Sequence, residues 1–296
     1  MTFPVFRFAP SPNGFLHLGH AYSALLNFTL ARKSGGRFLL RIEDIDRGRA
    51  RREFEVAIHE DLAWLGLEWE EPVRRQSEHF DDYARALGRL DAMGLLYACD
   101  CKRSDIAHVA GAHPGWPRDP DGAPLYPGTC RAKPHPPARE ILAQGGVALR
   151  LDMQKAAALA GRGLSWREHE APGLEPHSLR DEDFAAIPCD PAQWGDVVLA
   201  RKDTPASYHI AVVVDDALQG VTNIVRGRDL FFATSLHRLL QRLLDLPEPR
   251  YRHHDLIRDE GGEKLAKSRG SATLRALREA GMSAEAVRRQ AGFQGA

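Results

Sequence analysis

The sequence predicts an α/β fold built around a parallel sheet, and three neighbouring segments near the N-terminus carry this prediction. A short apolar strand is expected at residues 5–9, a helix with apolar residues at helical spacing follows, and a second strand is expected at residues 37–44. Strand, helix and strand in this order form the right-handed crossover unit of a parallel sheet. The 296 residues suffice for one large domain or two ordinary ones.

The later elements are predicted from the same apolar spacing. Helices are expected at residues 54–65, 80–90 and 229–245, the last with Asp229 as its N-cap. Strands are expected at residues 147–152, 196–203 and 207–216. A loop at residues 258–271 leads into two short C-terminal helices. Residues 153–190 show no clear period, and we interpret them as rich in loops.

From Cys99 to about Pro137 the composition changes. Eight of the 19 prolines lie between Pro114 and Pro137. This composition predicts an irregular, non-helical insertion that needs something other than an apolar core to hold it.

Overall composition excludes few partners. The 40 basic and 40 acidic residues cancel, so local patches decide whether nucleic acid binds. The longest purely apolar runs, among them Ile210 to Val214, are five residues, too short to span a membrane. No export signal is recognisable, and four cysteines in so long a chain do not form a disulfide framework. We therefore expect a cytoplasmic protein whose cysteines are thiols or metal ligands.

The stretch "FLHLGH" places His17 and His20 where the first strand gives way to a helix. A helix N-terminus at the carboxyl edge of a sheet presents unpaired N–H groups, which form a ready anion site. Gly14 and Gly19 permit close approach of a ligand to the backbone. Two histidines here can donate hydrogen bonds to phosphate, although a capping and packing role explains them better when they are taken in isolation.

The stretch "EKLAKS" places Lys264, Lys267 and Ser268 in a glycine-flanked loop far along the chain. Ammonium groups on such a loop suit charge that develops on a polyphosphate, although taken alone they also fit a solvated loop. Together, "HLGH" and "KLAKS" resemble the HIGH and KMSKS signatures of the class I aminoacyl-tRNA synthetases. The resemblance implies that His17, Gly19, His20 and Lys267 bind ATP, with Mg²⁺. It also implies that Lys267 and Lys264 stabilise the phosphate while an aminoacyl-adenylate forms.

Longer stretches resemble the glutamyl/glutaminyl branch of that family, namely "RFAPSPNGFLHLGH", "RIEDIDRGRAR" and "SYHIAVVVDDALQGVTNIVRG". The substrate that this implies, L-glutamate, carries two carboxylates and one ammonium. Arg7 and Arg226 can make forked contacts to carboxylates, and Glu43 can accept the ammonium. The resemblance adds Tyr208, Ser11 and the backbone near Ala9 to the glutamate site. This chain has Val212 where the full-length glutamyl enzymes have Asn, which implies one polar contact fewer.

Cys99 and Cys101 open the proline-rich insertion, with Cys130 downstream. Three cysteines and a fourth ligand can bind tetrahedral Zn²⁺, which would hold a segment without a core. His108, His113 and His135 are local alternatives for the fourth place. The spacing Cys-x-Cys…Tyr-x3-Cys resembles the zinc site of one subfamily, the glutamyl-Q tRNA(Asp) synthetases, and this implies Tyr126 as the fourth ligand of one structural zinc. Cys189 stands outside this group and is interpreted as structural.

The family resemblance implies a Rossmann-like class I catalytic domain with an inserted zinc-binding, acceptor-like subdomain and a short helical C-terminus. The expected division is residues 1–98 and 191–250 for the two catalytic halves, 99–190 for the insertion, and 251–296 for the "KLAKS" loop and C-terminal helices. We expect no anticodon-binding domain. The subfamily activates glutamate without tRNA and transfers it to queuosine in the anticodon loop of tRNA(Asp).

Two alternatives remain open at this point. One is a truncated conventional enzyme that charges tRNA(Glu), and the other is a non-catalytic, synthetase-like RNA-binding protein. A monomer is expected. Four basic residues near the expected mouth of the site either meet RNA phosphates or form a solvated helix start, and these are Arg47, Arg49, Arg51 and Arg52.

Overall fold

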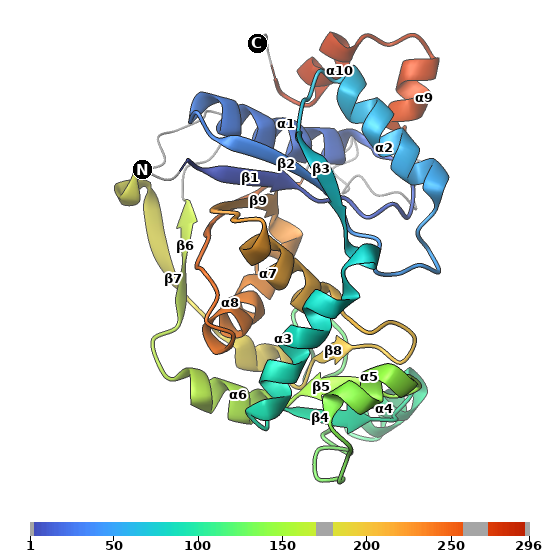
Figure 1. The fold of residues 1–296 in the computed structure, drawn as a ribbon, viewed down its shortest axis with the longest axis vertical. Helices are drawn as coiled ribbons and strands as arrows, with labels where there is room; N and C mark the ends of the chain where they lie inside the picture. Colours follow the sequence, from blue (N-terminus) through green and yellow to red (C-terminus); the bar gives the residue numbers. More distant parts are fainter. Residues whose placement is uncertain (1–2, 170–179, 257–271, 294–296) are drawn as a thin grey trace.

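A computed structural model describes residues 3–169, 180–256 and 272–293 (Figure 1). Its central feature is a mostly parallel sheet. The parallel strands are β1 (Val5–Phe8), β2 (Arg37–Ile42), β3 (Glu70–Arg75), β9 (Asn223–Gly227), β10 (Arg250–His254) and β6 (Ser165–His169). Strand β7 (Phe184–Pro188) is antiparallel to β6 at one edge.

Two groups of strands from distant parts of the chain build this sheet. Strands β1, β2 and β3 pair in parallel, and so do β9, β10 and β6. Strands β1 and β9 lie side by side and join the two groups. The amide of Thr222, the residue before β9, donates to the carbonyl of Val5 at 3.0 Å. The order is therefore β3-β2-β1-β9-β10-β6-β7. The β6–β10 pairing crosses the divisions at residues 190 and 250 that were expected from sequence.

Helices cover both faces of the sheet. Helices α1 (Leu18–Lys33) and α2 (Arg52–Trp64) lie on one face, whereas α7 (Tyr208–Leu218) and α8 (Ala233–Leu243) lie on the other (Figure 1). Helix α3 (Phe80–Ala92) packs against α7. Helix α1 begins at the N-cap His17 and ends before Gly35, whose φ of 62° suits glycine. The predicted helices at 54–65 and 80–90 are confirmed.

A smaller antiparallel sheet forms the second body of the molecule, at the bottom of Figure 1. Its strands are β4 (Leu96–Cys99), β5 (Ala148–Leu151) and β8 (Val198–Ala200). Helices α4 (Arg103–Gly111), α5 (Ala138–Gln144) and α6 (Met153–Ala160) belong to the same region. The prediction of a non-helical insertion is wrong at α4. No residue of this helix is buried, so it lacks the apolar stripe that periodicity detects.

The prediction of a buried strand at residues 207–216 is also wrong, because helix α7 occupies this stretch. Residues Ile210 to Val214 are all buried, since α7 packs between α3 and α8. A helix that is apolar on every side has no amphipathic period, and its β-branched residues favour a strand prediction.

The predicted N-cap at Asp229 is corrected as well. Asp229 lies in a 3₁₀ turn, η4 (Arg228–Leu230), and α8 begins only at Ala233 with Phe232 in the N-cap position. The turn carries the chain around the end of β9 before the helix starts, so the acidic residue precedes the cap instead of forming it.

Residues 153–190 contain more regular structure than expected. Helix α6, strands β6 and β7, and the 3₁₀ turn η2 (Asp181–Asp183) lie within this range, and residues 170–179 are outside the described part. A further 3₁₀ turn, η3 (Pro191–Trp194), follows, and η1 (Gln76–Glu78) precedes α3. The two short C-terminal helices are confirmed as α9 (Leu274–Glu279) and α10 (Ala284–Gln290). Among the described helices, none has the length and apolarity that crossing a membrane requires.

Candidate active site

A cavity of about 570 Å³ opens at the carboxyl ends of β1, β2 and β9. This is where an open α/β sheet places its ligands. The structure brings together at this cavity every described residue that the sequence assigned to ATP or glutamate. They are Arg7, Ala9, Ser11, His17, Gly19, His20, Glu43, Tyr208 and Arg226. Lys264 and Lys267 lie outside the described residues.

His17 and His20 form a reciprocal cap at the start of α1. The Nδ1 atom of His17 accepts from the amide of Gly19 at 3.1 Å, and Nδ1 of His20 accepts from the amide of His17 at 3.2 Å. Each neutral ring therefore carries its proton on Nε2, as a donor suited to phosphate oxygen. A Cβ added at Gly19 would lie 3.0 Å from Cε1 of His17, so glycine leaves the ring its place. Capping and a position at the cavity are thus combined in one motif.

Arg7 is tied to a buried ionic cluster on the Glu43 side of the cavity. Its Nε donates to Oδ1 of Asp216 at 3.0 Å. Fully buried Arg41 donates to the same carboxylate at 2.7 Å and to Glu43 at 3.0 Å. Burial alone would raise the pKa of Asp216, but the charges of Arg7 and Arg41 outweigh it and lower that pKa. Burial raises the pKa of Glu43, against the opposing charges of Arg41 and Arg7.

The cluster continues through Asp215, which is fully buried in α7. Asp215 accepts from Arg74 at 2.7 Å, from Gln76 at 2.8 Å and from the phenol of Tyr83 at 2.9 Å. Sequence reasoning missed this cluster. The sequence feature that could have indicated this cluster is the pair Asp215–Asp216, which directly follows an apolar run. Carboxylates that are buried with such a run need buried partners.

Arg226 is held by a different kind of neighbour. Four of its five N–H groups donate to uncharged acceptors. Those acceptors are His253 at 3.1 Å, His237 at 3.1 Å, Thr234 at 2.8 Å and the carbonyl of Leu230 at 3.2 Å. A forked contact to a ligand carboxylate therefore requires Arg226 to release one of these bonds.

Tyr208 lies at the N-terminus of α7, beside the rings of His209 and His237 at centroid distances of 5.5 and 5.6 Å. Burial raises the pKa of its phenol, so the group is a neutral hydroxyl at the cavity wall. Val212 lies one turn further along α7, where it is buried in the apolar core. It is absent from the cavity lining formed by the described residues.

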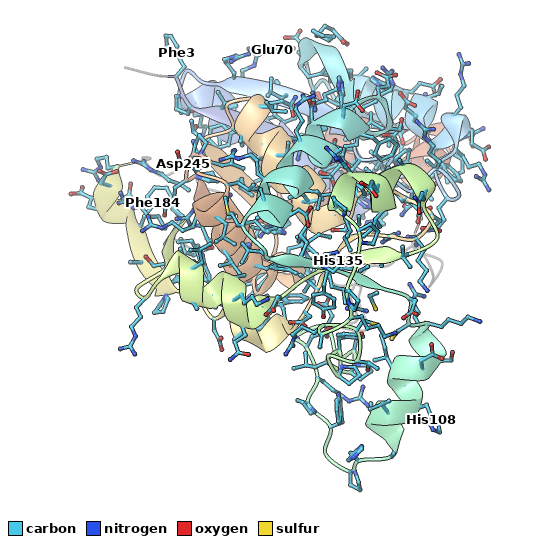
Figure 2. All side chains as sticks on the ribbon, turned by 60° about the horizontal axis from the view of Figure 1, so that its bottom comes forward. Phe3, Glu70, His108, His135, Phe184 and Asp245 are labelled. Carbon is cyan, nitrogen blue, oxygen red and sulfur yellow. The ribbon has the colours of Figure 1, made fainter. Side chains whose placement is uncertain are left out.

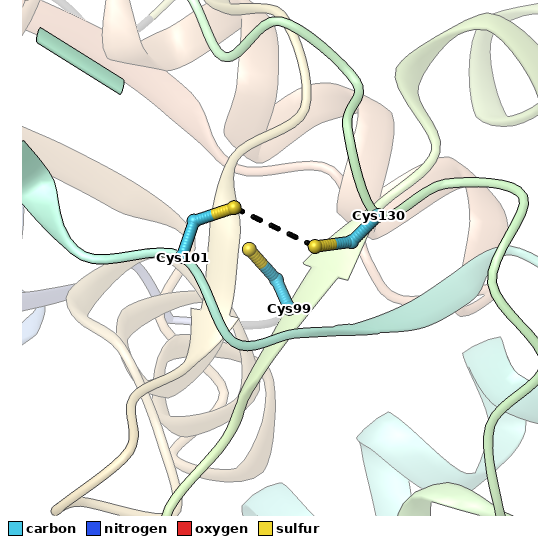
Figure 3. A group of neighbouring side chains, drawn as sticks. All are labelled: Cys99, Cys101 and Cys130. Carbon is cyan, nitrogen blue, oxygen red and sulfur yellow. Dashed lines mark hydrogen bonds between the residues drawn. The ribbon is translucent and has the colours of Figure 1, made fainter. Parts of the chain in front are cut away.

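The three predicted cysteines of the insertion converge (Figure 3). The sulfur atoms of Cys99, Cys101 and Cys130 all lie within 4.8 Å of one another, and those of Cys101 and Cys130 are 3.5 Å apart. Tetrahedral Zn–S bonds place two sulfurs about 3.8 Å apart. The phenol oxygen of Tyr126 lies 3.5 Å from the sulfurs of both Cys99 and Cys101, close to the sulfur–oxygen distance of about 3.5 Å in a tetrahedral site. The three cysteines can bind a metal ion.

The alternative ligands do not join this cluster. His108 and His113 are exposed and His135 is half-buried, and all three fall outside the one metal-binding group found among the described residues. Figure 2 shows His108 on α4, at the tip of the insertion. The Nδ1 atoms of His113 and His135 lie 3.0 and 2.9 Å from nearby backbone carbonyls. Cys189 is a free thiol outside the cluster, and burial raises its pKa to about 12.

The four basic residues before and at the start of α2 are exposed, as a nucleic-acid contact requires. Three of them also make protein contacts. Arg47 donates to the carbonyl of Ser77, Arg49 to Asp46, and Arg51 to the carbonyl of Gly48. Arg52 is the first residue of α2. Both earlier interpretations of these residues therefore remain compatible with their positions.

Comparison with known protein families identifies the class of protein to which this chain belongs. The family model for the catalytic domain of class I tRNA synthetases (E and Q) matches residues 5–136 and 169–295. The chain belongs to this family. The expected class I catalytic fold and the expected ligase of the aminoacyl-tRNA synthetase type are thereby confirmed.

Individual relatives are similar over nearly the whole chain. A protein from Rhodobacter capsulatus named glutamyl-Q tRNA(Asp) synthetase is 48% identical over 97% of this chain and 99% of its own length. One of the same name from Symbiobacterium thermophilum is 40% identical over 95% and 83%, respectively. The resemblance to this subfamily, expected from the cysteine pattern, is confirmed.

A crystal structure gives the same fold. A glutamate tRNA ligase from Elizabethkingia meningosepticum, in complex with its amino acid, aligns with a TM-score of 0.69 at 24% identity. The alignment covers 91% of this chain and 53% of that one. The chain thus spans about half the length of that protein, and the likeness supports the architecture alone.

Proposed function

We propose that the protein activates L-glutamate with ATP, without tRNA, and transfers it to queuosine in the anticodon loop of tRNA(Asp). The observation that carries this proposal is the single cavity shared by the capped histidine pair and by Arg7, Glu43 and Arg226. A phosphate-binding helix mouth and an amino-acid pocket must adjoin for an adenylate to form. The names of the relatives support glutamate as the amino acid.

In the activation step, a carboxylate oxygen of glutamate attacks the α-phosphorus of ATP, and the bond to the bridging oxygen breaks as pyrophosphate leaves. His17 and His20 hold the phosphates through Nε2–H donors. Lys267 and Lys264 offset the charge that develops during transfer. Mg²⁺, when bound with ATP, neutralises phosphate charge. The products are glutamyl-adenylate and pyrophosphate.

The amino acid is held by opposite charges on the cavity wall. Arg7 and Arg226 face its carboxylates, Glu43 accepts its ammonium, and Ser11 with the backbone of Ala9 completes the wall. Tyr208 supplies a neutral hydroxyl on the same side. This arrangement matches a dicarboxylic amino acid better than a neutral one, because a second buried cation without an anionic partner is costly.

In the transfer step, a hydroxyl of the cyclopentene-diol of queuosine attacks the glutamyl carbonyl and AMP leaves. The exposed Arg47, Arg49, Arg51 and Arg52 contact RNA phosphates in this proposal. One structural Zn²⁺ holds the insertion through Cys99, Cys101, Tyr126 and Cys130. The protein acts as a cytoplasmic monomer.

The test has two parts. Glutamate-dependent exchange of pyrophosphate into ATP, measured without RNA, should be robust, and its absence would favour a non-catalytic RNA-binding protein. Charging assays should then attach glutamate to tRNA(Asp) that carries queuosine and leave tRNA(Glu) uncharged. Robust charging of tRNA(Glu) would establish the alternative of a conventional glutamyl enzyme.

A further inference from the structure

We propose that His253 and His237 are positioning residues, which use acceptor nitrogens of uncharged rings to hold Arg226 as the cation that selects a side-chain carboxylate. The inference rests on the proposed function of the cavity, because it concerns how Arg226 recognises glutamate there. Both histidines are buried, and neither lines the cavity. Their effect on the ligand is therefore exerted through Arg226.

The tautomer of His253 is fixed from both sides. Its Nδ1 lies 2.9 Å from Oε2 of Glu168, and its backbone amide donates to Oε1 of the same carboxylate at 2.8 Å. A carboxylate only accepts, so Nδ1 carries the proton and Nε2 is the acceptor for Nε of Arg226. The indole of Trp166 also donates to Glu168, at 2.9 Å, which fixes the carboxylate itself.

The tautomer of His237 is the opposite one. A guanidinium only donates, so Nδ1 of His237 accepts from Arg226 at 3.1 Å. The proton of a neutral ring then lies on Nε2, which lies 3.2 Å from Nδ1 of His209 and donates to it. Residues from β6, β9, β10, α7 and α8 thus form one hydrogen-bonded chain, Glu168–His253–Arg226–His237–His209.

These rings are kept uncharged by their surroundings. Burial lowers the pKa of His253 to about 4, although Glu168 acts in the opposite direction. Burial and the charge of Arg226 lower the pKa of His237 well below its ordinary value. A proton on either acceptor nitrogen would point an N–H at the guanidinium and break its hydrogen bond. Uncharged histidines therefore orient Arg226 without cancelling its charge.

The charge left on Arg226 has a consequence for selectivity. Among the residues that the structure describes, no carboxylate contacts Arg226, and Glu168 reaches it only through His253. A ligand carboxylate entering the cavity supplies the missing anion, whereas a carboxamide of the same shape does not. The chain of histidines therefore favours glutamate over glutamine.

Matched pairs of variants separate positioning from mere packing. His253→Gln keeps an acceptor oxygen near the place of Nε2, whereas His253→Leu removes it. In the same way, His237→Asn keeps an acceptor near the place of Nδ1, whereas His237→Leu removes it. The readouts are KM for glutamate, KM for ATP and kcat in pyrophosphate exchange, together with the ratio of kcat/KM for glutamate to that for glutamine.

Each leucine variant should raise the KM for glutamate about 10- to 100-fold, the range for one lost buried hydrogen bond to a charged group. The KM for ATP should change less than about threefold, and the glutamate-to-glutamine ratio should fall. The amide variants should recover most of the loss. An unchanged KM for glutamate, or equal losses for glutamate and ATP without rescue, would overturn the proposal.

A second measurement does not depend on activity. Nitrogen-15 NMR of the histidine side chains in the parent protein at pH 7 should show His253 protonated at Nδ1 and His237 at Nε2. Charged rings or the reverse tautomers would contradict the inference whatever the exchange assay shows. Correct tautomers in a parent protein that lacks exchange would instead count against the proposed function alone.

Discussion

Arg7 and Arg226 are two buried arginines on one cavity, and they are neutralised in different ways. Arg7 shares Asp216 with Arg41 inside a cluster of opposite charges. Arg226 is surrounded by two histidines, a threonine and a carbonyl. A buried charge that is paired contributes mainly to the fold, whereas one held by neutral groups remains available to a ligand. Arg7 therefore contributes more to the stability of the fold, and Arg226 contributes more to recognition of the ligand.

The largest effect is expected at the carboxylate that Arg7 and Arg41 share. Asp216→Ala leaves both guanidiniums buried without this partner, and breaking a buried pair in this way costs about 3–5 kcal/mol. Urea unfolding of the variant should show this loss of unfolding free energy. Asp216→Asn is the matched control, because it keeps the shape and one acceptor, and it should lose less. A loss below about 1 kcal/mol for the alanine variant would show that Asp216 does not stabilise the fold by pairing with Arg7 and Arg41.

Replacing each arginine by glutamine separates its contribution to stability from its contribution to glutamate recognition. Arg226→Gln should lower kcat/KM for glutamate about 100-fold while the free energy of unfolding falls less than in Arg7→Gln, because removing Arg226 leaves no buried carboxylate without its cation. Arg7→Gln should destabilise the fold more, because Asp216 then keeps a single cation. Exchange kinetics and urea unfolding of both variants give the comparison. The reverse ranking in unfolding free energy would contradict it.

As pH falls, the histidines near Arg226 should lose their contribution to the free energy of unfolding before Asp216 does. The folded state lowers the pKa of His253 and of His209 to about 4, so the unfolded chain takes up these protons earlier as pH falls below about 6.5. Stability is then lost between about pH 6.5 and 4, by up to about 1.4 kcal/mol per pH unit for each histidine. The pKa of Asp216 is lowered, and its contribution is lost only below about pH 4.

Unfolding free energies at pH 7, 6 and 5 test this assignment. His253→Gln should show a shallower fall than the parent protein over this range, by about one proton. Equal slopes in the two proteins would mean that His253 does not carry the acid sensitivity.

The smallest effect on the cavity is expected from the cysteine cluster, which belongs to the smaller sheet. Cys130→Ser should reduce bound zinc, measured by elemental analysis, from about one per chain to a small fraction. The KM for glutamate in exchange should change by less than about threefold, because the cluster contacts neither arginine. A parent protein purified without zinc would remove the zinc proposal. A large rise in KM would link the two regions.

Sequence reasoning predicted the sheet, the first helix and the wall of the cavity because these are local or carried by contiguous motifs. The strand–turn–helix at residues 5–33 is one continuous signal, and so is the cysteine pattern. Helix α7 was not predicted as a helix, because an apolar run that is buried on all sides has no amphipathic period. Once it was taken as a strand, Asp215 and Asp216 could not be recognised as anchors for Arg41 and Arg7.

The histidine chain could not be predicted for a different reason. His253 lies on β10 and His237 on α8, and their contacts with Arg226 on β9 follow from packing between elements. Nothing in the spacing of these residues indicates which ring nitrogen faces a guanidinium. Such an arrangement is visible only once the parallel pairing of β9 with β10 is known.

Pyrophosphate exchange in the absence of RNA, compared between the parent protein and Arg226→Gln, is the decisive test of glutamate activation in this cavity. We expect robust exchange that depends on L-glutamate in the parent protein and about a 100-fold lower kcat/KM for glutamate in the variant. Exchange that does not depend on glutamate, or that proceeds equally well in both proteins, would contradict the assignment of this cavity to glutamate activation.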